Sequence, residues 1–87
     1  MAKLLIVHKF KKERLEHARF QDVIDEFPNA RISNSCFVID TKLTPKQIYR
    51  ELRGFISDTD SLFVMTVSSP WHGRGENEVV DWMTKWF

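Results

Sequence analysis

The sequence predicts an α+β fold: a four-stranded antiparallel sheet with two helices, followed by an extra helix at the C-terminus. Two short apolar runs, residues 4–7 and 36–39, are rich in branched side chains and are typical of buried strands. Residues 44–47 read Thr-Pro-Lys-Gln, which is typical of a helix start, and an apolar run at residues 62–67 follows that helix. Strand, helix and strand therefore follow one another in the second half of the chain, and the first half supplies the matching elements.

The first half is predicted to contain a strand, a helix and a second strand. After the strand at residues 4–7, a polar segment leads into a helix that continues to about Phe27. The apolar face of this helix has four side chains at the helical spacing: Phe20, Val23, Ile24 and Phe27. Pro28 ends the helix because its ring cannot continue one. Residues 30–33 then form a short strand, and residues 34–35 form a tight turn or a bulge.

The second helix has the clearest local signal in the chain. Thr44 caps it, Pro45 lies in the first turn, where a missing N–H removes no helical hydrogen bond, and Gln47 completes a capping box. One apolar face follows at the helical spacing: Ile48, Tyr49, Leu52, Phe55 and Ile56. Gly54 lowers the stability of a helix by about 1 kcal/mol relative to alanine. Close packing against a neighbouring element would explain its presence.

The remaining elements complete the predicted sheet. Residues 58–60 and 68–75 are loops on either side of the strand at residues 62–67. The tail is predicted to form a third helix, because its apolar residues recur at the helical spacing: Val79, Val80, Met83, Trp86 and Phe87. Short connections and right-handed crossovers favour a ferredoxin-like βαββαβ sandwich with strand order 4-1-3-2. Residues 4–7 and 36–39 are then the central strands, and we expect residues 1–87 to form a single domain.

Composition restricts the class of partner and the compartment. A net charge of +1 argues against a protein that wraps nucleic acid by charge alone. Cys36 is the single cysteine, which excludes an internal disulfide and fits a reducing compartment. The apolar run at residues 4–7 is too short for a signal peptide or a membrane span. We therefore expect a cytoplasmic protein without membrane contact, in which Cys36 is a small buried apolar side chain.

Basic side chains gather between the first strand and the first helix, and they are the candidate nucleic-acid-binding residues: Lys9, Lys11, Lys12 and Arg14. The alternative is a solvated charged face, which is the usual role of such a run. The basic helix face with Arg14 and Arg19 lacks the interleaved aromatic side chains that are expected of a protein that binds single-stranded nucleic acid.

His8 lies at the end of the first strand, where functional groups are often presented. In the predicted sheet its neighbours are Ser35, Cys36, Asp60 and Ser61. A pair of His8 and Asp60 would increase the affinity of the histidine for a proton, so these two residues are the candidate catalytic pair. The alternative is a surface histidine that follows a buried strand. The histidines, the cysteine and the carboxylates show no zinc spacing, and we expect no metal and no cofactor.

The loop of residues 68–75 and the start of the third helix contain the candidate ligand-binding residues Trp71, His72 and Arg74. Trp71 offers a stacking face, His72 and Arg74 offer hydrogen-bond donors, and two glycines allow close approach of the backbone. Glu76, at the helix start, would repel an anion. The alternative is that Trp71 only packs the third helix onto the sheet.

Three segments occur in a fixed order: Ser35-Cys36-Phe37-Val38-Ile39, then Leu43-Thr44-Pro45 with its helix, then Asp60-Ser61-Leu62-Phe63-Val64. This order resembles the small CRISPR-associated adaptation nuclease subunit and its relatives, the VapD-type toxin ribonucleases and the SinR-like proteins of bacteria and phages. The SinR-like group is the most similar, because it also follows its last strand with a tryptophan-containing loop and a short helix. The resemblance implies a small homodimer with nuclease or nucleic-acid-binding roles in mobile-element conflict.

The nuclease members of that family carry a metal-binding aspartate at the end of the first strand, where this chain has His8. We therefore expect a cytoplasmic, homodimeric binding or regulatory module in phage–host or mobile-element conflict, without strong catalytic activity, whose partner is RNA, DNA or a protein. An apolar edge strand at residues 62–67 and an apolar tail also favour a dimer. One alternative is a ribonuclease that acts through His8 or the loop of residues 71–76. The other is a nucleotide or small-ligand binder that uses the same loop.

Overall fold

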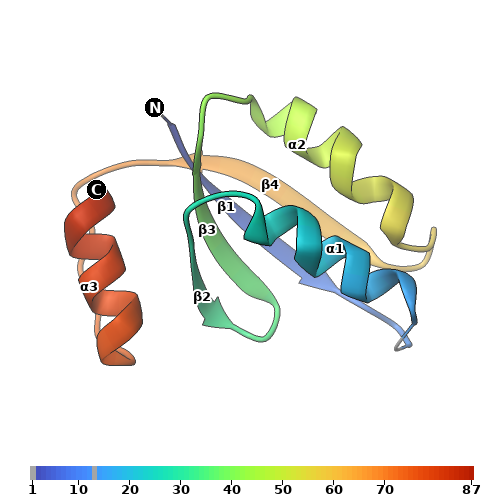
Figure 1. The fold of residues 1–87 in the computed structure, drawn as a ribbon, viewed down its shortest axis with the longest axis horizontal. Helices are drawn as coiled ribbons and strands as arrows, with labels where there is room; N and C mark the ends of the chain where they lie inside the picture. The colour runs from blue at the N-terminus through green and yellow to red at the C-terminus, as the bar shows by residue number, and fades with distance from the viewer. Residues whose placement is uncertain (1, 13) are drawn as a thin grey trace.

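The computed structural model describes residues 2–12 and 14–87, and it contains a four-stranded antiparallel sheet and three α-helices (Figure 1). The elements in chain order are β1 (Ala2–Lys9), α1 (Glu16–Asp25), β2 (Asn29–Ser33), β3 (Cys36–Thr41), α2 (Pro45–Leu52), the short 3-10 helix η1 (Arg53–Phe55), β4 (Ser61–Val67) and α3 (Asn77–Trp86). The α+β class and each predicted strand and α-helix are confirmed.

The sheet has the strand order β2-β3-β1-β4, which is β4-β1-β3-β2 when read from its other edge. The two most apolar runs occupy the central strands β1 and β3, as predicted. Leu4 lies opposite Ile39 of β3 and Thr66 of β4. A register shift between Arg31 and Ser33 interrupts the pairing of β2 with β3, just before the turn at residues 34–35.

The core lies between the sheet and the helices α1 and α2, which both cover the same face (Figure 1). Alternation along β1 sends Leu4, Ile6 and His8 to that face, and all three are buried. The buried apolar cluster contains residues of four elements: Leu4, Ile6, Phe20, Ile24, Phe37, Ile39, Ile48 and Leu52. Burial of a large apolar side chain stabilises a fold by roughly 1.5–3 kcal/mol, so this cluster holds the two layers together.

The predicted helix signals are confirmed at both helices of this layer. Phe20 and Ile24 of α1 are buried, and Val23 and Phe27 pack against the core. At the start of α2 the Gln47 backbone N–H donates to Thr44 Oγ1 at 3.2 Å, and the Thr44 N–H donates to Gln47 Oε1 at 2.8 Å. The capping box is therefore complete, with Pro45 in the first turn.

The predicted reason for Gly54 was wrong. The α-helix ends at Leu52, and Gly54 lies in η1 with a negative φ. A Cβ atom built on Gly54 would meet nothing within 4 Å, so no neighbouring element packs closely against it. The last apolar residues of the predicted stripe, Phe55 and Ile56, still pack against the core from η1 and the residue after it.

The third helix lies apart from the other two. The segment after β4 runs past the end of the sheet, and α3 lies beside β2, on the opposite side from α1 and α2 (Figure 1). The second face of the sheet therefore stays partly uncovered, with Phe63 62% and Met65 42% exposed. No helix in the described part of the chain is both long enough and apolar enough to cross a membrane.

Candidate functional site

Aromatic and imidazole rings stack at the end of β1, and together with Asp60 they form what we call the histidine cluster: His8, Phe10, His17, Phe37 and Asp60. The His8 and Phe10 ring centroids are 4.2 Å apart, and those of Phe10 and His17 are 3.5 Å apart. Phe37 stacks on the other side of His8 at 5.9 Å. The three chain segments β1, α1 and β3 therefore meet in one continuous stack.

His8 is a buried residue whose surroundings disfavour the charged form of its imidazole. Its backbone N–H donates to the Ser35 carbonyl oxygen at 2.9 Å, and its side chain is packed so that the residue is only 8% exposed. Nδ1 has no hydrogen-bond partner among the described residues. Burial lowers the pKa of His8, and electrostatic interactions with His17 and Arg31 lower the pKa further. The prediction of a surface histidine, given as the alternative, was wrong.

The predicted pair of His8 and Asp60 does not form as a direct contact. The Asp60 carboxylate instead accepts hydrogen bonds from the backbone N–H groups of Lys11 at 2.8 Å and Ser57 at 2.9 Å. These bonds lower the pKa of Asp60. The negative charge of Asp60 does raise the pKa of His8, but burial outweighs it and the net direction is downward. The predicted direction of the Asp60 contribution is therefore correct, but the direct pair is absent and burial dominates.

The histidine beside Asp60 is His17, which the sequence analysis missed. Its Nε2 lies 3.7 Å from Asp60 Oδ2, and both side chains are almost fully buried. The Arg14 backbone N–H donates to His17 Nδ1 at 3.2 Å. In the neutral imidazole the proton therefore belongs on Nε2, facing Asp60. A signal for His17 existed: the α1 stripe of Phe20, Ile24 and Phe27, extended one turn backwards, reaches residue 17.

A hollow of about 400 Å³ opens beside the cluster, and His8, His17, Gln21, Arg31 and Asn34 contribute its polar lining. The Arg31 guanidinium carbon lies 5.6 Å from the centre of the Phe37 ring. The hollow combines imidazole rings with a cation and amides, and this set can accept a proton or hold a polar ligand. Within residues 2–12 and 14–87, no group of three or more histidine, cysteine or acidic side chains is placed to hold a metal ion.

The candidate ligand-binding residues of the loop come together in one hollow of about 260 Å³. Trp71, His72 and Arg74 line it from the loop, while Ile32 of β2 and the apolar residues Val79, Val80 and Met83 of α3 line the other side. Trp71 is half-buried, and His72 and Arg74 are exposed. An aromatic face, two donors and an apolar wall are the usual parts of a small-ligand site.

The candidate nucleic-acid-binding residues form an exposed rim at the opposite end of the sheet. Lys9 ends β1, and Lys11, Lys12 and Arg14 lie in the connection to α1. A hollow of about 320 Å³ is lined by Lys11, Lys12 and Arg14 on one side and by Ser57, Thr59 and Asp60 on the other. The Arg14 guanidinium contacts Glu16 Oε1 at 3.4 Å, which offsets part of the positive charge. No aromatic side chain lines this hollow in the described part of the chain.

Cys36 is a free, half-buried thiol at the start of β3, directly opposite Val7 of β1. Burial raises the pKa of this thiol, which favours the neutral form. The side chain therefore packs as a small apolar group, although less deeply than the sequence predicted.

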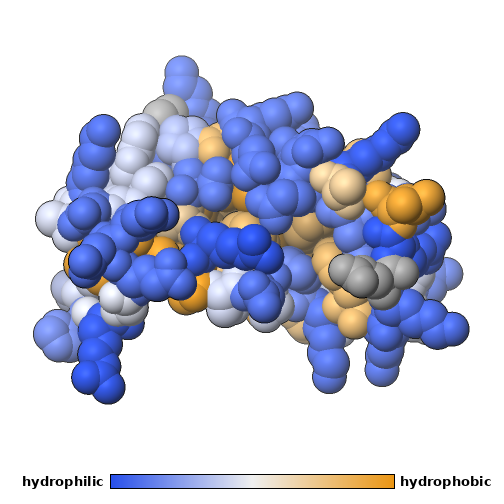
Figure 2. Space-filling view, turned by 60° about the horizontal axis from the view of Figure 1, so that its bottom comes forward, coloured by the Kyte–Doolittle hydropathy of each residue, from blue (hydrophilic) through white to orange (hydrophobic). Residues whose placement is uncertain are grey.

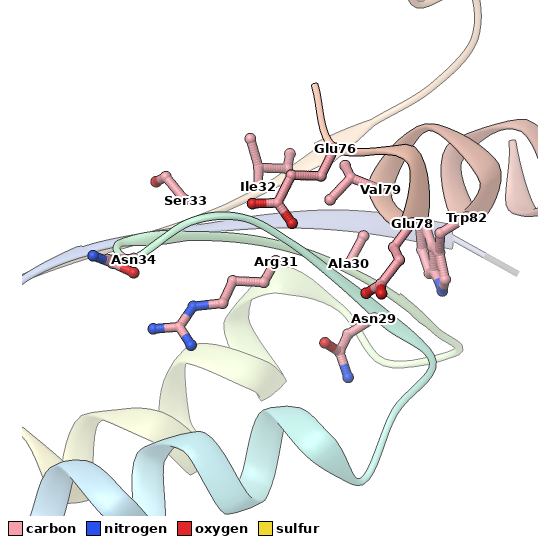
Figure 3. Close-up of a pocket in the computed structure, with 10 residues that line it drawn as sticks. All are labelled: Asn29, Ala30, Arg31, Ile32, Ser33, Asn34, Glu76, Glu78, Val79 and Trp82. Carbon is pink, nitrogen blue, oxygen red and sulfur yellow. The ribbon is translucent and has the colours of Figure 1, made fainter. Parts of the chain in front are cut away.

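A fourth hollow, of about 500 Å³, lies between β2 and the start of α3 (Figure 3). It is lined by all of β2, by Asn34, and by Glu76, Glu78, Val79 and Trp82. Local sequence patterns do not predict this hollow, because the position of α3 relative to β2 depends on contacts between residues more than 40 positions apart.

Comparison of the chain with family models, with curated proteins and with solved structures finds no match.

Proposed function

We propose that the protein is a ferredoxin-like binding module of the SinR-like type, working as a homodimer in the cytoplasm in phage–host or mobile-element conflict. The observation that carries the proposal is an exposed apolar surface on the sheet face that α1 and α2 do not cover. The βαββαβ order of elements and the central position of β1 and β3 support the ferredoxin-like description. The free thiol of Cys36 fits a reducing compartment.

The apolar surface follows from the strand register. Val7 lies opposite Cys36 on one side and Phe63 on the other, and Leu5 lies opposite Met65. These side chains point away from the helices because their neighbours Leu4, Ile6 and Val64 point towards the core. Figure 2 shows one face of the molecule, on which hydrophobic surface is exposed between hydrophilic side chains. A standard interface buries roughly 800 Å² on each partner, about an eighth of the 6188 Å² surface of this chain.

The state of the histidine cluster supports a binding role rather than catalysis. Asp60 is already bound by two backbone N–H groups, and His17 is engaged at Nδ1 by Arg14. His8 is buried, and no carboxylate orients its ring through a hydrogen bond in the described part of the chain. An acid–base catalyst needs a reachable, oriented group, and both histidine rings instead stack on the ring of Phe10.

The dimer is tested by a charged substitution on the exposed sheet face. We expect the purified protein to have a mass near twice its 10.3 kDa by light scattering at micromolar concentration. The double variant Phe63→Lys/Met65→Lys should have the mass of one chain while keeping its circular dichroism spectrum. Tyr49→Lys, at an exposed position of α2, is the matched control and should stay dimeric. A monomeric wild-type protein at 100 µM would refute the homodimer.

A second function, nucleotide or small-ligand binding, is favoured by the hollow that Trp71, His72 and Arg74 share. A ligand at a concentration of 100 times its Kd stabilises a protein by about 2.7 kcal/mol. If this site binds a nucleotide, at least one member of a nucleotide panel should therefore raise the melting temperature of the protein. Arg74→Ala should abolish the increase, and Arg50→Ala on α2 should not. The absence of any increase across the panel would exclude this function for the ligands tested.

Ribonuclease activity is the remaining alternative, and it has a direct test. A ribonuclease that uses His8 degrades RNA and loses this activity in His8→Ala, with or without EDTA. We expect the wild-type protein to cleave RNA no faster than the His8→Ala variant does. Cleavage that disappears in His8→Ala, in a variant with unchanged circular dichroism, would replace the binding function by an enzymatic one.

A further inference from the structure

The hollow between β2 and α3, which we call the β2–α3 groove, follows an open edge of the sheet. β2 is an outermost strand of the sheet, and within residues 2–12 and 14–87 it pairs with β3 alone. The outward-facing backbone N–H and C=O groups of such a strand have no partner strand and are free to bind an added one. Every residue of β2 lines the groove, and Arg31, Ile32 and Ser33 are exposed, so the second half of the strand is accessible from solvent.

The second wall of the groove is acidic. Glu76 and Glu78 extend their carboxylates from the start of α3 towards β2 (Figure 3). Neither carboxylate forms a salt bridge within residues 2–12 and 14–87. Arg31 also borders the groove, but its side chain points away from α3 (Figure 3) and its guanidinium carbon lies 5.6 Å from the centre of the Phe37 ring. The α3 side of the groove is therefore negatively charged.

One end of the groove is arranged to hold a cationic side chain. Glu78 and Trp82 are four residues apart on α3 and lie on the same side of the helix (Figure 3). Asn29 faces them from the start of β2. Its Nδ2 donates to the carbonyl oxygens of Phe27 at 3.0 Å and Ile24 at 3.5 Å, which leaves Oδ1 as an acceptor. A carboxylate, an indole ring and an amide oxygen are three groups that attract an ammonium or guanidinium ion.

We propose that the β2–α3 groove binds an extended peptide segment that carries lysine or arginine at alternate positions. The peptide adds to the free edge of β2 through main-chain hydrogen bonds. Alternate side chains of a strand point the same way, so the basic ones meet Glu76, Glu78 and Trp82. A nucleic acid is disfavoured here because its phosphates would face the two carboxylates. The inference does not rest on the dimer, since Phe63 and Met65 belong to the opposite edge strand β4.

The probe is a fluorescein-labelled peptide of alternating lysine and valine, about as long as β2, measured by fluorescence anisotropy. We expect saturable binding that weakens as salt is added. Glu78→Gln should raise the Kd about two- to fivefold, the range expected for the loss of one exposed charge pair. Asp81→Asn removes a carboxylate from the same helix outside the groove, and it should leave the Kd unchanged.

Two further measurements locate the peptide. In NMR spectra the amide signals of Asn29–Ser33 should shift on titration and exchange more slowly with solvent. A peptide N-methylated at alternate residues, which cannot donate to a strand edge, should not bind. The monomeric Phe63→Lys/Met65→Lys variant should still bind the unmodified peptide, which separates this inference from the proposed dimer.

Four results would overturn the proposal. They are shifts confined to β4, equal binding of a peptide of alternating glutamate and valine, equal effects of Glu78→Gln and Asp81→Asn, and undiminished binding of the N-methylated peptide. Protection of the β2 amides that grows with protein concentration, without peptide, would instead identify a second copy of the chain as the occupant.

Discussion

The chemistry of His8 depends more on burial than on its charged neighbours. The sequence correctly placed His8 near Ser35 and at the end of the first strand, because strand register follows from the apolar pattern. It did not indicate how deeply the ring would be packed between Phe10 and Phe37. Asp60 raises the pKa of His8 as predicted, but burial of the ring is the larger effect and lowers the pKa overall.

This lowered pKa predicts a loss of stability in mild acid. His8 has a folded-state pKa below 6.5, so the unfolded chain takes up its proton first as the pH falls. The free energy of unfolding should therefore decrease as the pH falls from 6.5 to the lower pKa of the folded state. The titratable and charged groups that act on His8 are His17, Arg31 and Asp60. A variant that tests this prediction must therefore change His8 and leave these three residues in place.

His8→Phe preserves the ring stack and should flatten this part of the pH profile, measured by urea unfolding between pH 5 and pH 8. His72→Gln, in the exposed loop, is the control and should keep the profile of the wild-type protein. A His8→Phe variant with the same acid sensitivity as the wild type would show that another group causes it.

At the scale of single elements, α2 shows how local signals determine structure. Its capping box joins residues only three positions apart, Thr44 and Gln47, so the sequence contains all the information that the motif requires. The end of the helix was less predictable. The apolar stripe continued to Ile56, but the backbone changes to a 3-10 turn after Leu52 while keeping the same side chains on the core.

Removal of the cap should weaken the whole fold by a modest amount. Thr44→Ala leaves the Gln47 N–H without its side-chain acceptor, and loss of such a cap typically lowers the free energy of unfolding by about 1 kcal/mol. Chemical unfolding at pH 7 measures this difference. Thr84→Ala, which removes a hydroxyl that bonds only within α3, should change stability by less; an equal effect would contradict the role of the capping box.

Replacement of Gly54 by alanine should stabilise the protein, whereas removal of the helix cap should destabilise it. Gly54 has a negative φ and free space around the position of a Cβ atom. Gly54→Ala should therefore raise the free energy of unfolding by about 0.4–1 kcal/mol, because alanine restricts the unfolded chain without strain in the folded one. Ala18→Gly, at an exposed position of α1, is the reciprocal control and should destabilise. A destabilised Gly54→Ala protein would reveal a constraint at this turn.

At the scale of the whole molecule, one core connects both central strands with both covering helices. Ile6 lies in the middle of β1, opposite Phe37 and Val64, and is fully buried. Ile6→Ala should lower the free energy of unfolding by about 2–5 kcal/mol, a large share of the 5–15 kcal/mol that is typical of a domain. Lys9→Ala, exposed on the same strand, should stay within about 0.5 kcal/mol of the wild type. Thermal and urea unfolding test both variants, and similar effects would contradict the assigned core.

The sequence by itself determined the strands, the three helices, the capping box and the central position of β1 and β3. These features depend on the spacing of residues close together in the chain, which sets the face that each side chain occupies. Only the tertiary structure decided that His17 rather than His8 lies beside Asp60, and that α3 borders β2 to form a groove. Both depend on pairs far apart in the chain, such as Lys11 and Asp60, 49 positions apart, and local spacing carries no information about such distances.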